Sequence, residues 1–525
     1  MYSIILRNAN IIDGTGKEPD LADVAISGDK IAKIGNITDR GTREVDLKKQ
    51  ILCPGFIDMH SHSDLDIMKT NAMEHRVRQG VTTELIGQDG LSIAPLMQGR
   101  EDLVKENVAP FLGKITDPWD WTDYTSYLNK IESKTLKNNV LALVGHGTIR
   151  TAVMGVANRS PVNGELDSMR QMLRDCIKAG AHGMSLGLIY PPCSYSDTSE
   201  LIELAKILRE YDGILISHMR NEMDKLLESI KEMITIAEKS NVRIHISHLK
   251  AYGVDNWGKA REALDLIDQG IANGLKISFD QNPYNAGNTF LKACVPGWAY
   301  DGGEDEFQKR LRDKQLFTRI KKDTVVLFNA RGGENRIVLC SIESPKYKKY
   351  EGQLFRDIAH DIGADPVDIL LDMLKDSRSQ ALAIYFIISE DDIKTIMTHP
   401  SYTVGSDGLV GNVPHPRAYG AFPRVISKYV YEEHTLSVEN AIMHMTQMPA
   451  NVLQLQDRGT IKESYIADIV VFDPKTIKDM STYQNPRLYP TGISYVLVNG
   501  QMVVDDGKYL NNCNPGMLLK KQLHT

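Results

Sequence analysis

The chain has 525 residues, 42% of them hydrophobic, and a formal net charge of −7. That is enough for one large core and a smaller domain. There is no long basic run and no interleaving of aromatic with basic residues, so nucleic acid is excluded as an expected partner. No apolar run approaches the ~18 residues that span a bilayer, and the six cysteines lie far apart, so we expect a cytoplasmic protein with reduced thiols and no membrane contact.

The two ends of the chain carry β-type patterns. Residues 1–54 alternate short β-type runs with turns, until Pro54 and Gly55 break the pattern. The same pattern returns after about residue 450 and continues to residue 525. Neither end has enough strands to be stable alone, so we predict that residues 1–54 and 451–525 form one small β-sandwich together.

Residues 55–450 follow a rhythm of strand, loop and helix. Helix-type segments such as 199–211 and 225–240 carry apolar residues at spacings of three and four. This alternation predicts an α/β fold, a (β/α)8 TIM-like barrel, in which functional side chains lie at the carboxyl ends of the strands. The predicted strands are 56–60, 82–87, 139–145, 183–187, 213–218, 242–248, 276–280 and 402–407.

The interval between the last two predicted strands is too long for a single crossover. At about residues 290–345 it contains a charged helical piece and two β-type runs, TVVLFN and RIVLCSI. We interpret this segment as an inserted subdomain over the barrel mouth, placed to act as a lid.

Side chains that bind metals follow several of the predicted strands. His60 and His62 alternate with Ser61, so in an extended strand they point the same way at ~6.5 Å, close enough to bind one divalent ion. Four further residues of this kind end later strands, which predicts a metal centre. They are Asp89, His218, His248 and Asp407.

The order of the motifs resembles the D-aminoacylases, the N-acyl-D-amino-acid deacylases of the amidohydrolase superfamily, over nearly the whole chain. The motifs that carry this resemblance are PGFIDMHSHSD, QGVTT, GQDGLSIAPL, LVGHGTIR, GMSLGLIYPP, SHMRNE, HISHLK, DQNPYNAG, VGSDG, HPRAYGAFPR and RGTIKESYIADIVVFDP. The resemblance implies a metal-dependent hydrolase acting on linear amide C–N bonds, with an N-acyl-D-amino acid as its small-molecule substrate.

The resemblance also implies roles for the metal-ligand residues. His218 and His248 match the two histidines of the tightly held metal, and His60 and His62 would hold a second, looser one. Asp407 matches the catalytic aspartate, which would take a proton from water and deliver it to the leaving amine. An ordinary turn before Gly408 would also explain Asp407.

Other matched positions concern the substrate and the surroundings of the metal. Lys250, Tyr284 and Arg417 match residues that grip the substrate carboxylate and assist at its carbonyl. We interpret His146 either as a residue that supports the metal ligands or as a structural histidine. Arg220 and Glu222 are interpreted as a supporting ion pair.

Asp89 is where the chain departs from the family. The usual segment is glycine-asparagine-cysteine-glycine, with the cysteine on zinc, whereas this chain has Gly87-Gln88-Asp89-Gly90. A carboxylate can also bind zinc and can bridge two cations, so the number of divalent ions, one or two, stays open. We expect Zn²⁺, with Mn²⁺ or Co²⁺ as alternatives. Asp89 could instead only cap a turn. The fourth strand lacks the lysine that, in many relatives, is carboxylated and bridges two metals.

Two rival functions stay open. A cyclic amidase of the hydantoinase or dihydroorotase type would share the fold and the paired histidines, but the missing lysine and the match at Arg417 count against it. A non-catalytic scaffold would be free to lose metal ligands, yet five candidate residues are all present: His60, His62, His218, His248 and Asp407.

Overall fold

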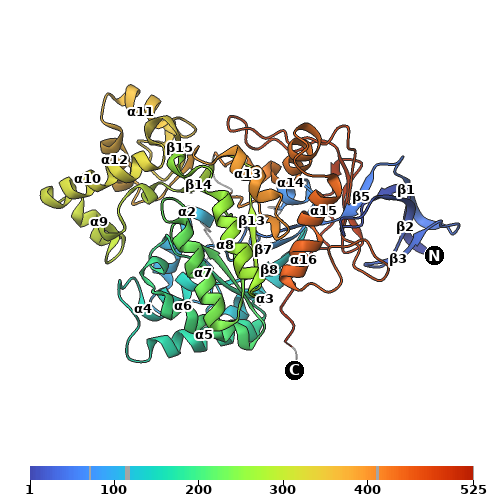
Figure 1. Cartoon of the computed structure of the whole chain (residues 1–525), viewed down its shortest axis with the longest axis horizontal. Coiled ribbons are helices and arrows are strands. Elements are labelled where there is room, and N and C mark those ends of the chain that lie inside the picture. The colour runs from blue at the N-terminus through green and yellow to red at the C-terminus, as the bar shows by residue number, and fades with distance from the viewer. Residues whose placement is uncertain (70–72, 113–118, 410–412, 524–525) are drawn as a thin grey trace.

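The computed structural model describes residues 1–69, 73–112, 119–409 and 413–523. Along the longest axis of the molecule, strands from the amino-terminal part of the chain lie at one end and helices of the segment between residues 300 and 380 lie at the other (Figure 1). Within the described residues, no helix is long and apolar enough to cross a membrane.

Each of the eight predicted inner strands has a counterpart, and neighbouring strands run parallel. They form a three-stranded sheet in the order β6-β7-β8 and a six-stranded sheet in the order β17-β13-β12-β11-β10-β9. The strands are β6 (Phe56–Asp58), β7 (Val81–Ile86), β8 (Asn139–Ala142), β9 (Val144–Gly145), β10 (Gly183–Gly187), β11 (Ile214–His218), β12 (Arg243–Ile246), β13 (Ile277–Gln281) and β17 (Tyr402–Val404).

Backbone hydrogen bonds connect the two sheets. Only Leu143 separates β8 from β9, and its N–H donates to the carbonyl of Ile86 at 3.0 Å. At the other edge, the Met59 N–H donates to the Val404 carbonyl at 3.2 Å. Just beyond it, the Asp407 N–H donates to the His60 carbonyl at 2.8 Å. The carboxyl ends of the first and last parallel strands therefore lie together.

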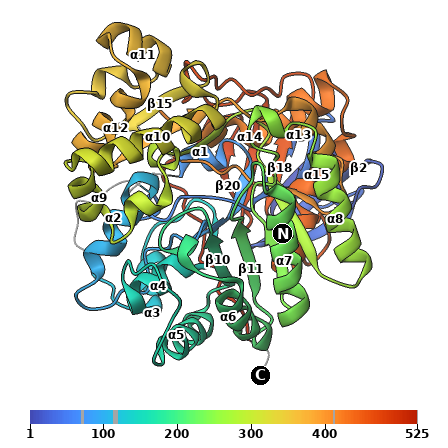
Figure 2. The ribbon, with the colours of Figure 1, turned by 60° about the vertical axis from the view of Figure 1, so that its left-hand side comes forward.

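Amphipathic helices cover the parallel strands. Helix α6 (Thr198–Glu210) begins after Asp197, whose side chain accepts a hydrogen bond from the Glu200 N–H, and it buries apolar residues at spacings of three and four. Figure 2 shows α5, α6 and α7 around β10 and β11. The helices outside residues 300–380 are α1 (Glu74–Val77), α2 (Glu101–Leu112), α3 (Tyr124–Glu132), α4 (His146–Met154), α5 (Glu165–Ala179), α7 (Leu226–Ser240), α8 (Ala260–Ala272), α13 (Glu390–Met397), α14 (Arg417–Arg424), α15 (Val438–Met445) and α16 (Gln447–Leu453).

Both ends of the chain contribute to one nine-stranded sheet. Strand β5 from the first end pairs antiparallel with β18 from the second, with Pro54 opposite Ile469. A separate apolar cluster, which includes Leu6, Val24 and Val471, packs within this sheet. Its strands are β1 (Tyr2–Ile11), β2 (Asp20–Ser27), β3 (Lys30–Gly35), β4 (Gly41–Asp46), β5 (Ile51–Pro54), β18 (Ile469–Phe472), β19 (Ile493–Val498), β20 (Gln501–Asp505) and β21 (Lys508–Tyr509).

The chain between β13 and β17 forms an additional unit with its own antiparallel sheet, in the order β14-β16-β15. The predicted insertion at about 290–345 stops short of β16, which pairs with both other strands. The run TVVLFN is not a strand, because it lies in a helix that buries Ile320, Thr324 and Phe328 at a spacing of four. The elements are β14 (Gly287–Phe290), α9 (Glu304–Arg310), α10 (Lys314–Ala330), β15 (Ile337–Ile342), α11 (Phe355–Ile362), α12 (Pro366–Asp376) and β16 (Ala381–Tyr385).

Candidate metal centre and cavity

The Asp89 carboxylate lies among four histidine side chains. Its Oδ1 is 3.6 Å from His60 Nε2 and 3.7 Å from His248 Nε2. Its Oδ2 is 3.7 Å from His62 Nε2 and 3.6 Å from His218 Nδ1. All five residues are buried. The strand ends therefore bring together the residues that the sequence pattern selected, and each oxygen of Asp89 faces two imidazoles.

These distances are too long for hydrogen bonds and suit atoms that share a metal ion. Two ligands held at ~2.1 Å from one ion in tetrahedral geometry are about 3.4 Å apart. Among the described residues, Asp89 Oδ1 and both ring nitrogens of His218 are buried without any hydrogen-bond partner. Buried polar atoms are rarely left unsatisfied, so the donor set fits a divalent cation.

The backbone at the site is held in an unusual conformation. Asp89, His248 and Asp407 have φ values of 56°, 35° and 51°, in the left-handed region that side chains other than glycine rarely adopt. Two residues before Asp89, Gly87 has φ of 79°, and a Cβ there would lie 2.2 Å from the Leu143 carbonyl oxygen. Backbone strain of this kind gathers where a function requires a particular side-chain direction.

The end of β10 explains why the fourth strand bears no lysine. A Cβ placed on Gly187 would lie 2.0 Å from the backbone oxygen of Asp89. The Asp89 loop therefore occupies the space that a side chain on this strand end would need.

Asp407 has its two oxygens in different surroundings. Its Oδ1 lies 3.4 Å from His62 Nε2 and 3.8 Å from His60 Nε2, whereas its Oδ2 is 2.7 Å from Arg417 Nη1. Burial opposes ionisation of this carboxyl, but Arg417 and the neighbouring histidines hold its pKa well below the usual range. Asp407 is therefore an ionised carboxylate whose Oδ1 faces His60 and His62 and whose Oδ2 is held by the buried Arg417 guanidinium.

Glu222 belongs to the cluster, and its predicted ion pair with Arg220 does not form. Glu222 lies 2.8 Å from Lys250 Nζ and 3.0 Å from His248 Nδ1. Burial and Lys250 oppose protonation of His248, but Glu222 and Asp89 outweigh them and raise the pKa of His248 to about 10. Arg220 instead pairs with Glu232 of α7 at 3.0 Å, a partner twelve residues along the chain that no local motif indicates.

Asp280 is a site residue that the sequence reasoning missed. Its Oδ2 lies 3.7 Å from His60 Nδ1 and 3.0 Å from His245 Nε2, and its Oδ1 accepts a hydrogen bond from the His248 N–H. It therefore orients two of the candidate ligands. The available signal was an acidic residue at the end of the predicted strand 276–280.

The centre opens into a cavity of about 690 Å³ between the strand ends and the additional unit. Asp89, His218, His248 and Asp407 lie at its wall, as do Lys250 and Arg417. The remaining lining includes Tyr190, Tyr252, Asn288, Lys292 and Arg331. Since the additional unit contributes part of this lining, it is positioned to contact a bound molecule.

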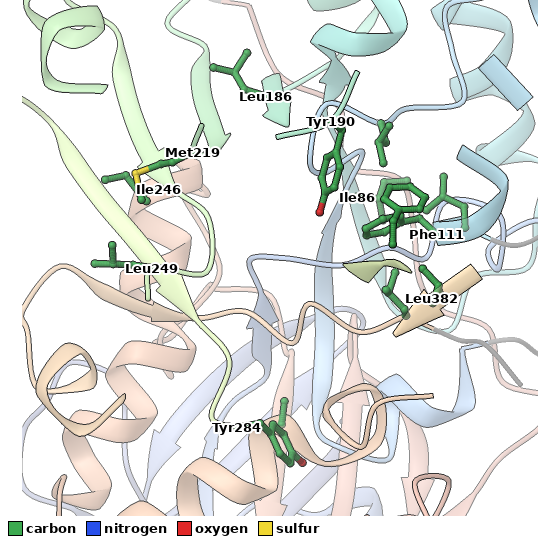
Figure 3. Close-up of a cluster of buried hydrophobic side chains, with 14 of the residues drawn as sticks. Ile86, Phe111, Leu186, Tyr190, Met219, Ile246, Leu249, Tyr284 and Leu382 are labelled. Atoms are coloured by element: carbon green, nitrogen blue, oxygen red, sulfur yellow. The ribbon is translucent and has the colours of Figure 1, made fainter. Parts of the chain in front are cut away.

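Tyr284 is not among the residues that line the cavity, so its contact with a substrate stays a prediction. Its hydroxyl donates to Asp479 Oδ2 at 2.8 Å, and the Arg424 guanidinium lies 4.6 Å from its ring centre. Figure 3 shows Tyr284 apart from Tyr190, with its hydroxyl pointing away from the rest of the cluster. The position of Tyr284 after β13 can be predicted from the sequence, but the direction of its side chain cannot.

His146 lies away from the cavity, where its Nε2 is 2.8 Å from Glu200 Oε1. Glu200 also binds Arg150, so the three side chains form a buried ionic cluster. This arrangement agrees with a structural role for His146.

Comparisons with known proteins agree with this geometry. The model of the amidohydrolase family matches residues 43–312 and 329–504. A D-aminoacylase of Alcaligenes xylosoxydans xylosoxydans is 31% identical over 96% of this chain and 94% of its own. An N-acyl-D-glutamate deacylase of the same organism is 32% identical, over 99% and 96%.

Solved structures lead to the same group. A crystal structure of a D-aminoacylase superposes with a TM-score of 0.84 at 31% identity, covering 99% of this chain and 100% of its own. An N-acyl-D-glutamate deacylase from Bordetella bronchiseptica, complexed with zinc and a phosphonate inhibitor, gives 0.83 at 30% identity over the same shares. The chain therefore has an amidohydrolase-type fold and belongs to the amidohydrolase family. Its similarity within that family is to the D-aminoacylases, so the resemblance inferred from the motifs is confirmed.

Proposed function

We propose that this protein is a metal-dependent amide hydrolase that removes the acyl group from N-acyl-D-amino acids. The observation that carries the proposal is the Asp89 carboxylate among four histidines at the wall of a large cavity. The names of the relatives support the reaction: one is a D-aminoacylase, and two others are N-acyl-D-aspartate and N-acyl-D-glutamate deacylases. The preference for the D configuration rests on these relatives.

One or two divalent ions would be held by the clustered side chains. His218, His248 and Asp89 would hold one ion, and His60 and His62 would hold a second. Zinc suits this set of imidazole and carboxylate ligands, with Mn²⁺ or Co²⁺ as alternatives. When bound, such an ion polarises the amide carbonyl and makes water a nucleophile near neutral pH.

The chain itself would move the proton and orient the substrate. Asp407 Oδ1 takes a proton from the attacking water and delivers it to the amide nitrogen as the C–N bond breaks, which leaves a carboxylic acid and a free amine. Arg417, bound to Oδ2, keeps the carboxylate ionised and fixed. Lys250 and Arg417 lie at the wall of the cavity, where they would contact the substrate carboxylate, although each already pairs with a carboxylate of the protein.

We also propose the finer architecture and location. The parallel strands of residues 55–450 are interpreted as a (β/α)8 barrel, with the unit from β14 to β16 inserted over its mouth. Residues 1–54 and 451–525 would form one β-sandwich-type domain. Six cysteines without a disulfide support a cytoplasmic location, where thiols stay reduced.

A substrate screen tests the reaction. Purified protein loaded with zinc, cobalt or manganese should release amino acid from N-acetyl-D-amino acids, and release from the matching L-enantiomers should be much slower. Hydantoin and dihydrouracil serve as the cyclic comparison. Preferred hydrolysis of a cyclic amide would replace the proposal with its main rival, and metal bound without any turnover would favour a non-catalytic scaffold.

A further inference from the structure

Six basic side chains line the cavity, and four of them already bind a carboxylate of the protein. The nitrogen–oxygen distances in these pairs run from 2.7 to 3.0 Å. The pairs are Arg220 with Glu232, Lys250 with Glu222, Arg378 with Asp305, and Arg417 with Asp407. Their positive charges are therefore largely neutralised before any substrate enters.

The two remaining basic residues, Lys292 and Arg331, differ in how they are compensated. Lys292 Nζ lies 4.5 Å from the ring centre of Phe290 and 5.7 Å from that of Tyr300, so aromatic faces stabilise its charge. Arg331 is only 7% exposed, and no carboxylate or side-chain hydrogen bond is found for it within residues 1–69, 73–112, 119–409 and 413–523. Its Nε is a buried atom without a partner.

The surroundings of Arg331 do not replace an anion. Burial raises the pKa of Tyr252, Tyr385 and Cys294, and the Arg331 charge acts on all three groups, so they surround it as neutral side chains. The Tyr385 hydroxyl donates to the Phe290 carbonyl at 3.0 Å and lies 3.7 Å from Cys294 Sγ, so it is engaged elsewhere. Arg331 directly follows α10, whose carboxyl end favours a cation only weakly.

A buried guanidinium without an anion is costly, and proteins seldom keep one without a use. Its planar fork matches a carboxylate, with two parallel N–H donors. It lines the same cavity as the metal centre, although it belongs to the unit between β13 and β17.

We propose that Arg331 binds a carboxylate of the substrate; where that carboxylate is the one on the side chain, the cavity is selective for acidic N-acyl amino acids. This assignment rests on the proposed function. The group bound is a carboxylate in either of two positions, the α-carboxylate that every N-acyl amino acid carries or a second one on the side chain. If Arg331 binds the α-carboxylate, hydrolysis of every N-acyl amino acid depends on it. If Arg331 binds the side-chain carboxylate, only hydrolysis of the acidic substrates does.

Steady-state kinetics of Arg331→Met on N-acetyl-D-methionine, N-acetyl-D-aspartate and N-acetyl-D-glutamate separate the two positions. Truncating one partner of a buried charge pair should lower kcat/KM by on the order of 10²-fold, mainly through KM. A loss confined to the two acidic substrates assigns the side-chain carboxylate, and an equal loss on all three assigns the α-carboxylate. Arg331→Lys should recover part of the loss. Unchanged kcat/KM on every substrate would overturn the proposal.

Arg312→Met is the matched control, because it removes an exposed arginine from the same unit outside the cavity. It should leave kcat/KM unchanged. Thermal unfolding adds a readout that a structural role would not give: Arg331→Met should unfold at the same or a higher temperature than the parent, since it removes an uncompensated buried charge. A lower unfolding temperature together with unchanged kinetics would make Arg331 structural.

Calorimetric binding of glutarate keeps this test independent of catalysis. Parent and Arg331→Met, loaded with the same metal to the same content, should differ on the order of 10²-fold in glutarate affinity. If the parent hydrolyses no N-acyl-D-amino acid but shows this difference, the proposed function fails and the carboxylate site stands. Equal glutarate affinity in both proteins, with equal kinetics, would reject the site.

Discussion

Two groups of buried histidines in this protein differ in how their ring nitrogens are satisfied. His182 and His444 each bond one backbone carbonyl oxygen, that of Leu519 at 2.7 Å and that of Tyr402 at 2.9 Å. Burial lowers the pKa of both to about 4, so each ring is a neutral donor near pH 7. In this group, each ring has a nitrogen that is satisfied by a hydrogen bond to the backbone.

The histidines around Asp89 show the opposite arrangement. His218 has two ring nitrogens without a hydrogen bond among the described residues, and it faces a carboxylate that three other imidazoles also approach. Asp89 and His248 are held in left-handed backbone conformations as well. Unsatisfied atoms and backbone strain both cost stability, so their coincidence at the strand ends indicates binding rather than folding.

The strongest test of this difference is to remove single histidines from each of the two groups. His218→Ala and His248→Ala should each abolish tight metal binding and nearly all hydrolysis, because each removes one ligand from a site that has only a few ligands. His182→Ala should keep metal and activity. Metal per chain, measured by mass spectrometry after dialysis, and turnover on the best substrate check both. Retained metal with near-parental turnover in His218→Ala would refute the site.

Replacing Asp407 should separate proton transfer from metal binding. Asp407→Asn keeps the shape but not the charge, so turnover should fall by ~10²–10⁴-fold, the usual contribution of a general acid–base group. Metal content should persist, since the Asp89 ligand set is untouched. Metal loss with unchanged turnover per bound ion would instead make Asp407 a ligand, as its distance of 3.4 Å from His62 also allows.

Asp89 offers a graded test. Asp89→Cys should shift the preference toward one tightly held zinc, because a thiolate is softer than a carboxylate and binds through a single sulfur. Asp89→Asn should weaken binding, because an anionic ligand is lost. Competition between zinc and manganese, read as metal bound per chain, measures both effects. Unchanged content and selectivity in both variants would leave Asp89 only as the cap of its turn.

The sequence predicted which side chains lie together at the strand ends, because each follows a strand and parallel strands bring their carboxyl ends to one edge. That these side chains bind a metal stays a prediction. It predicted side-chain partners poorly. Arg220 precedes Glu222 closely in sequence but pairs with Glu232, and Tyr284 follows β13 yet points at Asp479. Arg331 belongs to no motif, since its importance comes from the partner it lacks in the folded chain. Contacts set by packing between distant segments leave no local pattern to read.

The smallest expected effect concerns the group whose histidines are already satisfied. Burial, with Lys521 and Arg243 nearby, lowers the pKa of His182 from 6.5 to about 4, so the unfolded chain binds the proton more readily in that range. The stability that neutral His182 contributes is therefore present above pH 6.5 and is lost as the pH falls toward 4.

His182→Gln isolates this contribution, because glutamine can still donate to the Leu519 carbonyl but takes up no proton in this range. The difference in unfolding free energy between parent and variant should change by about 2 kcal/mol between pH 7 and pH 5, against the parent at the lower pH. Urea unfolding at both pH values measures it, and titration of the other groups cancels in the difference. A difference that does not vary with pH would mean that His182 is protonated when folded, and would remove the contrast with the histidines around Asp89.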